Sequence, residues 1–228
     1  MRAFFLLLLA CAHRAPRDTS AETTADTADS GRPPETSACG DWSGVARVGT
    51  RWTYAPTDAY VERWGMDGTY TVEVTTPAPE VTLSQAGAYA GEDGDFTWQR
   101  EDTWRCEDGW AWWTGSEATS DTSAGAHVTG SRTFDPGLRV RPASAEPGET
   151  WTDVLTLTQV ANGGEPTVSE VTCTASVSAA DPREMDGRTL TVRRLDLDCE
   201  GMHGDTVWLA QGVGLVATDD EEIVAYTE

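Results

Sequence analysis

The sequence predicts an all-β fold: a single curved, mostly antiparallel sheet, a half-barrel or open barrel, with little helix. Three observations predict it. Apolar and polar residues alternate along several stretches, and no period of 3.6 residues continues over three turns. Asp-Gly pairs, which favour tight hairpin turns, separate alternating runs. Ten Trp and 22 Gly among 228 residues also favour strands and turns over long helices.

The chain begins with a predicted signal peptide, residues 1–10. Met1 and Arg2 precede the apolar run from Ala3 to Ala10. This run is too short to span a bilayer, which takes about 20 residues, but it suits the core of a secretory signal peptide.

Residues 8–11 read LLAC and resemble the lipobox of bacterial lipoproteins. The resemblance implies cleavage before Cys11 and attachment of acyl chains, palmitate among them, to that cysteine. Stable anchoring needs more than one chain. Ala12 stands where an inner-membrane retention signal would place Asp, so the resemblance implies a lipid anchor in the bacterial envelope, at the outer rather than the inner membrane. The alternative is an ordinary signal peptide with an incidental cysteine.

Residues 11–38 are predicted to form the lipidated N-terminus and a disordered, acidic linker. From Arg17 to Ala38 the chain is dominated by Thr, Asp, Ser, Glu and Pro and holds no large apolar residue. As a flexible coil it would place the following domain about 25 Å from its anchor.

The charge balance excludes several function classes. All 16 basic residues are Arg, 38 are acidic, and the net charge is −22. Without Lys there is no Schiff-base chemistry and no phosphate-binding P-loop. A charge this negative repels phosphate backbones, so no nucleic-acid partner is expected. We expect no cofactor.

Residues 39–228 are predicted to form one β domain. Tyr70, Val72 and Val74 share one strand face, and alternate residues from Phe96 to Cys106 share another. The Asp108-Gly109 pair predicts a hairpin between residues 96–106 and 110–113, and Asp67-Gly68 and Asp186-Gly187 predict further turns. Later strands are expected near 151–160, 168–178, 188–199, 205–210, 213–218 and 222–227.

Four cysteines remain if Cys11 is lipidated, and their even number in an exported domain predicts two disulfides. Placing Cys173 opposite Cys199 also sets Ala175 against Leu197 and Val177 against Leu195, so a single register pairs sulfurs and apolar residues together. Cys39 is then left for Cys106. The predicted disulfides are Cys39–Cys106 and Cys173–Cys199.

Three segments of the C-terminal half carry a second resemblance: residues 147–151 (PGETW), 185–190 (MDGRTL) and 207–216 (VWLAQGVGLV). They resemble uncharacterised bacterial envelope lipoproteins related to the lipoprotein-carrier (LolA/LolB-like) half-barrel. The resemblance implies a curved antiparallel sheet with an apolar concave side. Gly212 and Gly214 suit a tight bend between two short strands, and no helix follows that could make them a dinucleotide-binding loop.

Catalytic and metal-binding patterns are weak. No metalloprotease or nucleophile-elbow motif occurs, and His127 and His203 lie in loop-like surroundings. We therefore predict no catalytic residues, with a hydrolase as the alternative. The acidic clusters at 92–95 and 219–222 could hold Ca²⁺, but they lack the EF-hand order. Solvated acidic turns explain them better, and no metal site is predicted.

Tryptophan is in excess around one predicted hairpin. Large aromatic side chains can fill a core, or they can line a groove for an apolar or glycan ligand. The candidate groove residues are Trp98, Trp104, Trp110 and Trp112.

Two functions follow. The first is a membrane-anchored, non-catalytic binding or carrier module for an apolar or glycan ligand. The alternative is a structural envelope protein that acts through protein–protein contacts without a small-molecule ligand.

Overall fold

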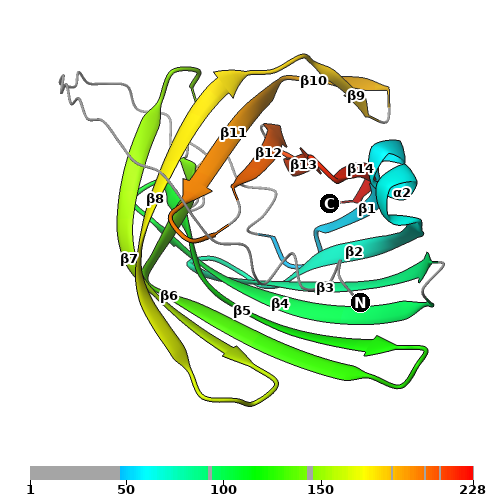
Figure 1. The fold of residues 1–228 in the computed structure, drawn as a ribbon. Helices are drawn as coiled ribbons and strands as arrows, with labels where there is room; N and C mark the ends of the chain where they lie inside the picture. Colours follow the sequence, from blue (N-terminus) through cyan, green and yellow to red (C-terminus); the bar gives the residue numbers. More distant parts are fainter. Residues whose placement is uncertain are drawn as a thin grey trace, which may run out of the picture.

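The computed structural model describes residues 47–91, 94–142, 146–185, 187–202, 204–210 and 212–227. The predicted signal peptide, Cys11, the linker and Cys39 lie outside these residues. The described chain forms a closed barrel of 12 antiparallel strands (Figure 1). In barrel order these are β1 (Arg51–Pro56), β14 (Glu221–Thr227), β13 (Gly214–Thr218), β12 (Asp205–Ala210), β11 (Val192–Cys199), β8 (Thr167–Ala179), β7 (Thr150–Ala161), β6 (His127–Pro142), β5 (Trp110–Thr122), β4 (Phe96–Glu107), β3 (Glu80–Gly91) and β2 (Met66–Thr76).

The closed barrel differs from the architecture that the sequence predicted. The sheet is all-β and antiparallel as expected, but the half-barrel or open barrel is wrong, and so is the half-barrel implied by the lipoprotein-carrier resemblance. Strand β1 pairs with β2 on one side and with β14 on the other. Alternation along one strand indicates which residues share a face; it carries no information on whether the first and last strands meet.

One of the two predicted disulfides joins two described cysteines. Cys173 and Cys199 are bonded across β8 and β11, with 3.9 Å between their Cα atoms. The predicted register is confirmed, because Ala175 pairs with Leu197 and Val177 with Leu195. The expectation of two such bonds is corrected to one within the described residues. Cys106 is itself disulfide-bonded, and Cys39, its predicted partner, lies outside them.

A short helix that the sequence did not predict lies between β1 and β2. Helix α2 (Asp58–Trp64) begins after Thr57, whose hydroxyl accepts a hydrogen bond from the Tyr60 amide, and ends at Gly65 in the left-handed conformation. The predicted turn at Asp67-Gly68 is wrong, since both residues belong to β2. Among the described residues, no helix is long and apolar enough to cross a membrane.

A turn is present at the glycine of each of the other two Asp-Gly pairs. Asp108 and Gly109 both have positive φ between β4 and β5, as predicted for a tight hairpin. Gly187 lies in the turn of a separate two-stranded hairpin, β9 (Arg183–Met185) and β10 (Arg188–Leu190). This hairpin is inserted between β8 and β11, which pair directly with each other beyond it.

Apolar residues on the inward face of the barrel strands form one core cluster. Tyr70, Val72 and Val74 of β2 belong to it, which confirms their predicted common face. Thr69, Thr71 and Glu73 alternate with them and are more exposed. The interior is thus mainly packed with side chains, and an open volume remains toward one end.

Candidate functional site: a cavity at one end of the barrel

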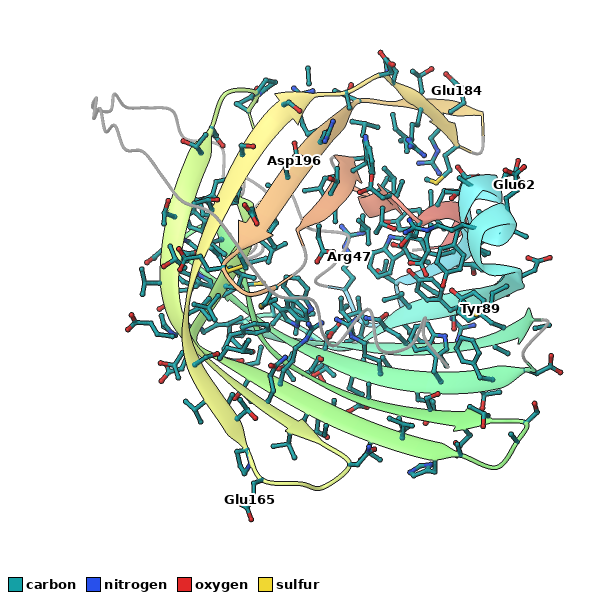
Figure 2. All side chains as sticks on the ribbon, in the orientation of Figure 1. Arg47, Glu62, Tyr89, Glu165, Glu184 and Asp196 are labelled. Carbon is teal, nitrogen blue, oxygen red and sulfur yellow. A yellow bond between two sulfur atoms is a disulfide. The ribbon has the colours of Figure 1, made fainter. Side chains whose placement is uncertain are left out.

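The cavity has a volume of about 130 Å³ and is partly open to solvent. It lies at the end of the barrel that carries α2, where β3 turns into β4 and β5 into β6 (Figure 1). Figure 2 labels Tyr89 at this end, below Glu62 of α2. We call it the α2-end cavity; its lining residues are Tyr60, Tyr70, Gln85, Tyr89, Phe96, Trp98, Arg100, Ser116, Ala118, Gly130, Ser131, Arg132 and Glu221.

An aromatic row crosses the wall of the cavity. Tyr54, Tyr70, Gly87 and Trp98 are register partners on four adjacent strands. The rings of Tyr54 and Tyr70 stack with centroids 5.0 Å apart, and Tyr70 meets Trp98 at 5.1 Å. A Cβ atom at Gly87 would lie 2.6 Å from Tyr70 Cβ and 2.8 Å from Trp98 Nε1. Glycine at this position therefore lets the two aromatic rings meet across β3.

The carboxylate of Glu221 forms the acidic pole of the cavity. Tyr70 donates a hydrogen bond to Oε2 at 2.7 Å, and Tyr89 donates one to Oε1 at 3.0 Å. Burial raises the pKa of Glu221, and the two tyrosine hydrogen bonds oppose that rise. Burial, together with the nearby Glu221 charge, also raises the pKa of Tyr60, to about 12. The phenols therefore remain protonated donors at neutral pH.

A second carboxylate lies inside the barrel wall and is fully engaged. Asp102 is 3% exposed, and its Oδ1 accepts a hydrogen bond from Arg100 Nε at 2.8 Å. Its Oδ2 accepts one from the Gln85 side-chain amide at 2.5 Å. Arg100 and Asp102 thus form an ion pair whose acid is shielded from solvent and held from both sides.

Arg132 of β6 is the second guanidinium of the cavity, and it has a different environment. Its Nε donates to Ser116 Oγ at 3.3 Å, and its guanidinium lies 4.1 Å from the centre of the Trp113 ring. No described carboxylate forms an ion pair with it. Burial and, to a lesser extent, the neighbouring Arg100 charge lower the pKa of Arg132 to about 9, although Asp102 and Asp205 act in the opposite direction. It therefore stays charged at neutral pH.

This arrangement suits recognition of a small molecule. Aromatic walls offer faces for a flat or apolar group, and a few polar groups at fixed positions can orient it. The ring faces, the tyrosine–glutamate pole and the guanidinium groups come from α2, β2–β6 and β14. The cavity is thus a product of closure, since Glu221 belongs to the last strand.

The structure separates the four predicted groove tryptophans. Trp98 lines the α2-end cavity. Trp104 lies on the same face of β4 but is 8% exposed and stacks on Trp113, with ring centroids 5.9 Å apart. Trp110 and Trp112 lie on the opposite face of β5 from Trp113 and do not line this cavity.

Trp110 and Trp112 instead belong to an outer patch with Trp151, Arg105 and Arg139. Trp110 meets Trp151 edge-on at 5.0 Å. Arg139 lies over Trp110 at 4.9 Å, and Arg105 lies over Trp112 at 5.5 Å. These contacts hold Trp110 and Trp112 on the face of β5 opposite Trp113, while Trp151 is half-buried and also packs against the core.

The other residues considered from the sequence occupy separate places. His127 Nδ1 contacts Asp121 Oδ1 at 2.7 Å on an exposed part of the β5–β6 hairpin, and His203 lies outside the described residues. The acidic cluster at 219–222 is divided, because Glu221 points into the cavity and Glu222 lies 3.7 Å from Arg183. In the described residues no group of three or more His, Cys, Asp or Glu is placed to hold a metal ion.

Sequence reasoning missed most of the cavity. The sequence around Glu221 favours a solvated acidic turn, and no pattern in the sequence distinguishes Arg132. One signal was present: Arg100 and Asp102 alternate with Phe96, Trp98 and Trp104 on a single strand face. A charged pair within an apolar face indicates a polar site inside the core.

The fold and cavity define a closed antiparallel β-barrel with a lined volume at one end. No protein-family model matches the chain, and no curated protein matches it. A solved structure similar to it is a "beta-barrel-like protein of domain of unknown function DUF1849" from Brucella abortus, at 11% sequence identity and a TM-score of 0.46. The match covers 78% of this chain and 97% of that one.

Proposed function

We propose that this protein is a non-catalytic binding or carrier module, tethered to the bacterial envelope, which takes a small ligand into the α2-end cavity. The observation that carries the proposal is the cavity itself, a volume of about 130 Å³ walled by five aromatic residues, Tyr60, Tyr70, Tyr89, Phe96 and Trp98. A cavity of roughly 150 Å³ can admit a molecule the size of benzene. We therefore expect a compact ligand with an apolar or ring-shaped part.

The proposed location rests on the N-terminal sequence and the disulfide. The LLAC motif at residues 8–11 resembles the lipobox of bacterial lipoproteins, and the acidic linker that follows suits a tether. The Cys173–Cys199 bond supports an oxidising compartment outside the cytoplasm. We propose a lipid anchor on Cys11 and an outer-membrane destination, as the residue after the cysteine implies.

The absence of catalysis is part of the proposal. Among the groups that line the cavity, Ser116 Oγ contacts a guanidinium rather than a general base. The tyrosine hydroxyls donate to Glu221 and remain protonated at neutral pH. Such groups position a ligand more readily than they attack one.

One observation favours the alternative function, a structural envelope protein that acts through protein–protein contacts. The outer patch of Trp110, Trp112, Trp151, Arg105 and Arg139 combines aromatic and Arg side chains, which are enriched in protein interfaces. A partner seated there would make the protein a contact point in the envelope. None of the outer-patch residues lines the cavity, and Trp110 and Trp112 lie on the face of β5 opposite the core, so the two roles can be tested separately.

Two experiments test the proposal. Titrating the full chain with neutral benzyl alcohol and hexanol in a calorimeter tests the cavity, and Gly130→Leu serves as a blocked variant. Saturable binding that the blocked variant loses supports a ligand site, whereas no binding of any probe, neutral or anionic, contradicts it. For the anchor, Cys11→Ala should move the protein from membrane to soluble fractions, and a variant that remains with membranes would refute the lipid tether.

A further inference from the structure

The cavity contains a guanidinium, that of Arg132, which forms no ion pair with a described carboxylate, although Asp102 and Asp205 act on it from a greater distance. The Arg132 guanidinium contacts one hydroxyl, Ser116 Oγ, and the faces of Trp113 and Phe134. Aromatic faces attract a cation but do not satisfy its N–H donors. A partly desolvated guanidinium with unused donors beside a cavity is suited to an anionic ligand.

The carboxylates near Arg132 are engaged elsewhere. Both oxygens of Asp102 accept hydrogen bonds, one from Arg100 and one from Gln85. Both oxygens of Glu221 accept hydrogen bonds, one from Tyr70 and one from Tyr89. Each of these two acids therefore has its own donors, and of the two guanidinium groups that line the cavity only that of Arg100 forms an ion pair with a described residue.

We propose that the α2-end cavity binds a monovalent organic anion, a carboxylate with an apolar ring or short chain, and that Arg132 pairs with its carboxylate. This proposal rests on the proposed binding function and names its ligand class. The planar guanidinium can donate two parallel hydrogen bonds to a carboxylate. The apolar part of the ligand would then lie against Phe96 and Trp98 on the facing wall.

The charge balance favours one negative charge over two. Arg100, Arg132 and Glu221 line the cavity; Asp102 pairs with Arg100, and Glu221 is held by two tyrosine hydroxyls rather than by a cation. Arg100 is neutralised by Asp102, so one guanidinium remains for the ligand. A second negative charge on the ligand would face Glu221 and Asp102 without a cation of its own, which disfavours a dianionic phosphate.

The test compares charged and neutral probes of the same shape. The full chain is titrated calorimetrically at pH 7 with benzoate, benzyl alcohol and phenyl phosphate, and with hexanoate against hexanol. Arg132→Met removes the charge while keeping much of the side-chain volume. Arg105→Met is the matched control, because it changes the net charge equally and lies in the outer patch.

We expect benzoate to bind about tenfold or more tightly than benzyl alcohol, as a charge-assisted hydrogen bond implies. That preference should disappear in Arg132→Met and persist in Arg105→Met. Phenyl phosphate should bind more weakly than benzoate. If phenyl phosphate binds more tightly, the carboxylate assignment is overturned and the site is one for phosphate esters.

Other outcomes separate this inference from the binding function. Equal affinity for benzoate and benzyl alcohol in the natural chain overturns the anion site and leaves a neutral ligand site standing. Failure of every probe to bind overturns both. If Arg132→Met does not fold, Arg132→Lys retains the charge without the planar fork, and loss of most of the benzoate preference is expected there. An unchanged benzoate preference in a folded Arg132→Met contradicts the inference.

Discussion

Trp52 and Val213 are joined by a buried hydrogen bond, 2.7 Å from the indole Nε1 to the backbone carbonyl oxygen. The bond links β1 to the residue just before β13, although β14 lies between these strands in the barrel order. Tyr54 repeats the arrangement, with its hydroxyl donating to the Leu215 carbonyl at 2.8 Å. The register between β13 and β14 consists of a single pair, Ala217 with Glu222. Side chains of β1 therefore reinforce the barrel where its backbone ladder is shortest.

Trp52→Phe should destabilise the protein by about 1–3 kcal/mol, because it leaves the buried Val213 carbonyl without this donor and removes part of a packed ring. Tyr54→Phe, which removes one hydroxyl, should cost about 1 kcal/mol. Both effects are measured as shifts in the midpoint of urea unfolding.

Trp112→Phe is the matched control. Its indole N–H is buried and has no hydrogen-bond partner in the described part of the chain, so the same substitution removes no such bond there. If Trp52→Phe and Trp112→Phe shift the midpoint equally, the side-chain hydrogen bonds of β1 do not stabilise the barrel between β1 and β13.

Gly87→Ala should disturb the aromatic row of the cavity. The added methyl group would lie within 3.0 Å of both Tyr70 and Trp98, so the rings must move apart at a cost of about 1–3 kcal/mol. A change in near-ultraviolet circular dichroism should accompany the loss of stability. Gly204→Ala is the control, because the nearest atom to its Cβ would be the Leu197 carbonyl oxygen at 3.4 Å. If Gly87→Ala changes neither the stability nor the circular dichroism, the rings of Tyr70 and Trp98 can move apart without cost.

Glu221→Gln should change how stability depends on pH. The pKa of Glu221 is raised by burial, so the folded state retains this proton at pH values where the unfolded chain has lost it. The natural protein therefore loses stability from this group as the pH rises through the unfolded pKa, near 4.3, up to the raised folded pKa. Glu221→Gln should lack that loss, and its advantage over the natural chain should grow with pH and then level off.

The measurement is the urea midpoint of both chains at several pH values between about 4 and 8. Glu222→Gln is the control, since its exposed carboxylate changes the net charge equally. A difference that is constant with pH, or that shrinks as the pH rises, would contradict the assigned direction.

Replacing Cys173 and Cys199 together by Ala should lower stability by about 3.5 kcal/mol, the entropy expected for a loop with a sequence separation of 26. Adding a reductant to the natural chain should weaken it as well. The double variant itself should not respond to the reductant through this bond. A double variant as stable as the natural chain would show that the register between β8 and β11 needs no covalent support.

Several features were accessible from the sequence because they depend on neighbours along the chain. Alternation identified the inward faces of β2 and β4, and the Asp108-Gly109 pair identified a tight hairpin. The pairing of Cys173 with Cys199 followed from apolar residues that had to share one face. Helix α2 was missed because seven residues are too few to show a helical period, although Thr57 and Gly65 mark its two ends.

By itself, the sequence determined that the domain is an antiparallel β structure, which residues of β2, β4, β8 and β11 share a face, and how β8 pairs with β11, since period-2 alternation is local chemistry. The tertiary structure decided that β1 meets β14 and closes the barrel. It also decided that Glu221, Tyr70 and Tyr89 form one acidic pole and that Arg132 faces a cavity without an acid of its own. These relationships join residues far apart in the chain, and they depend on strand tilt and stagger around the barrel, which no local pattern records.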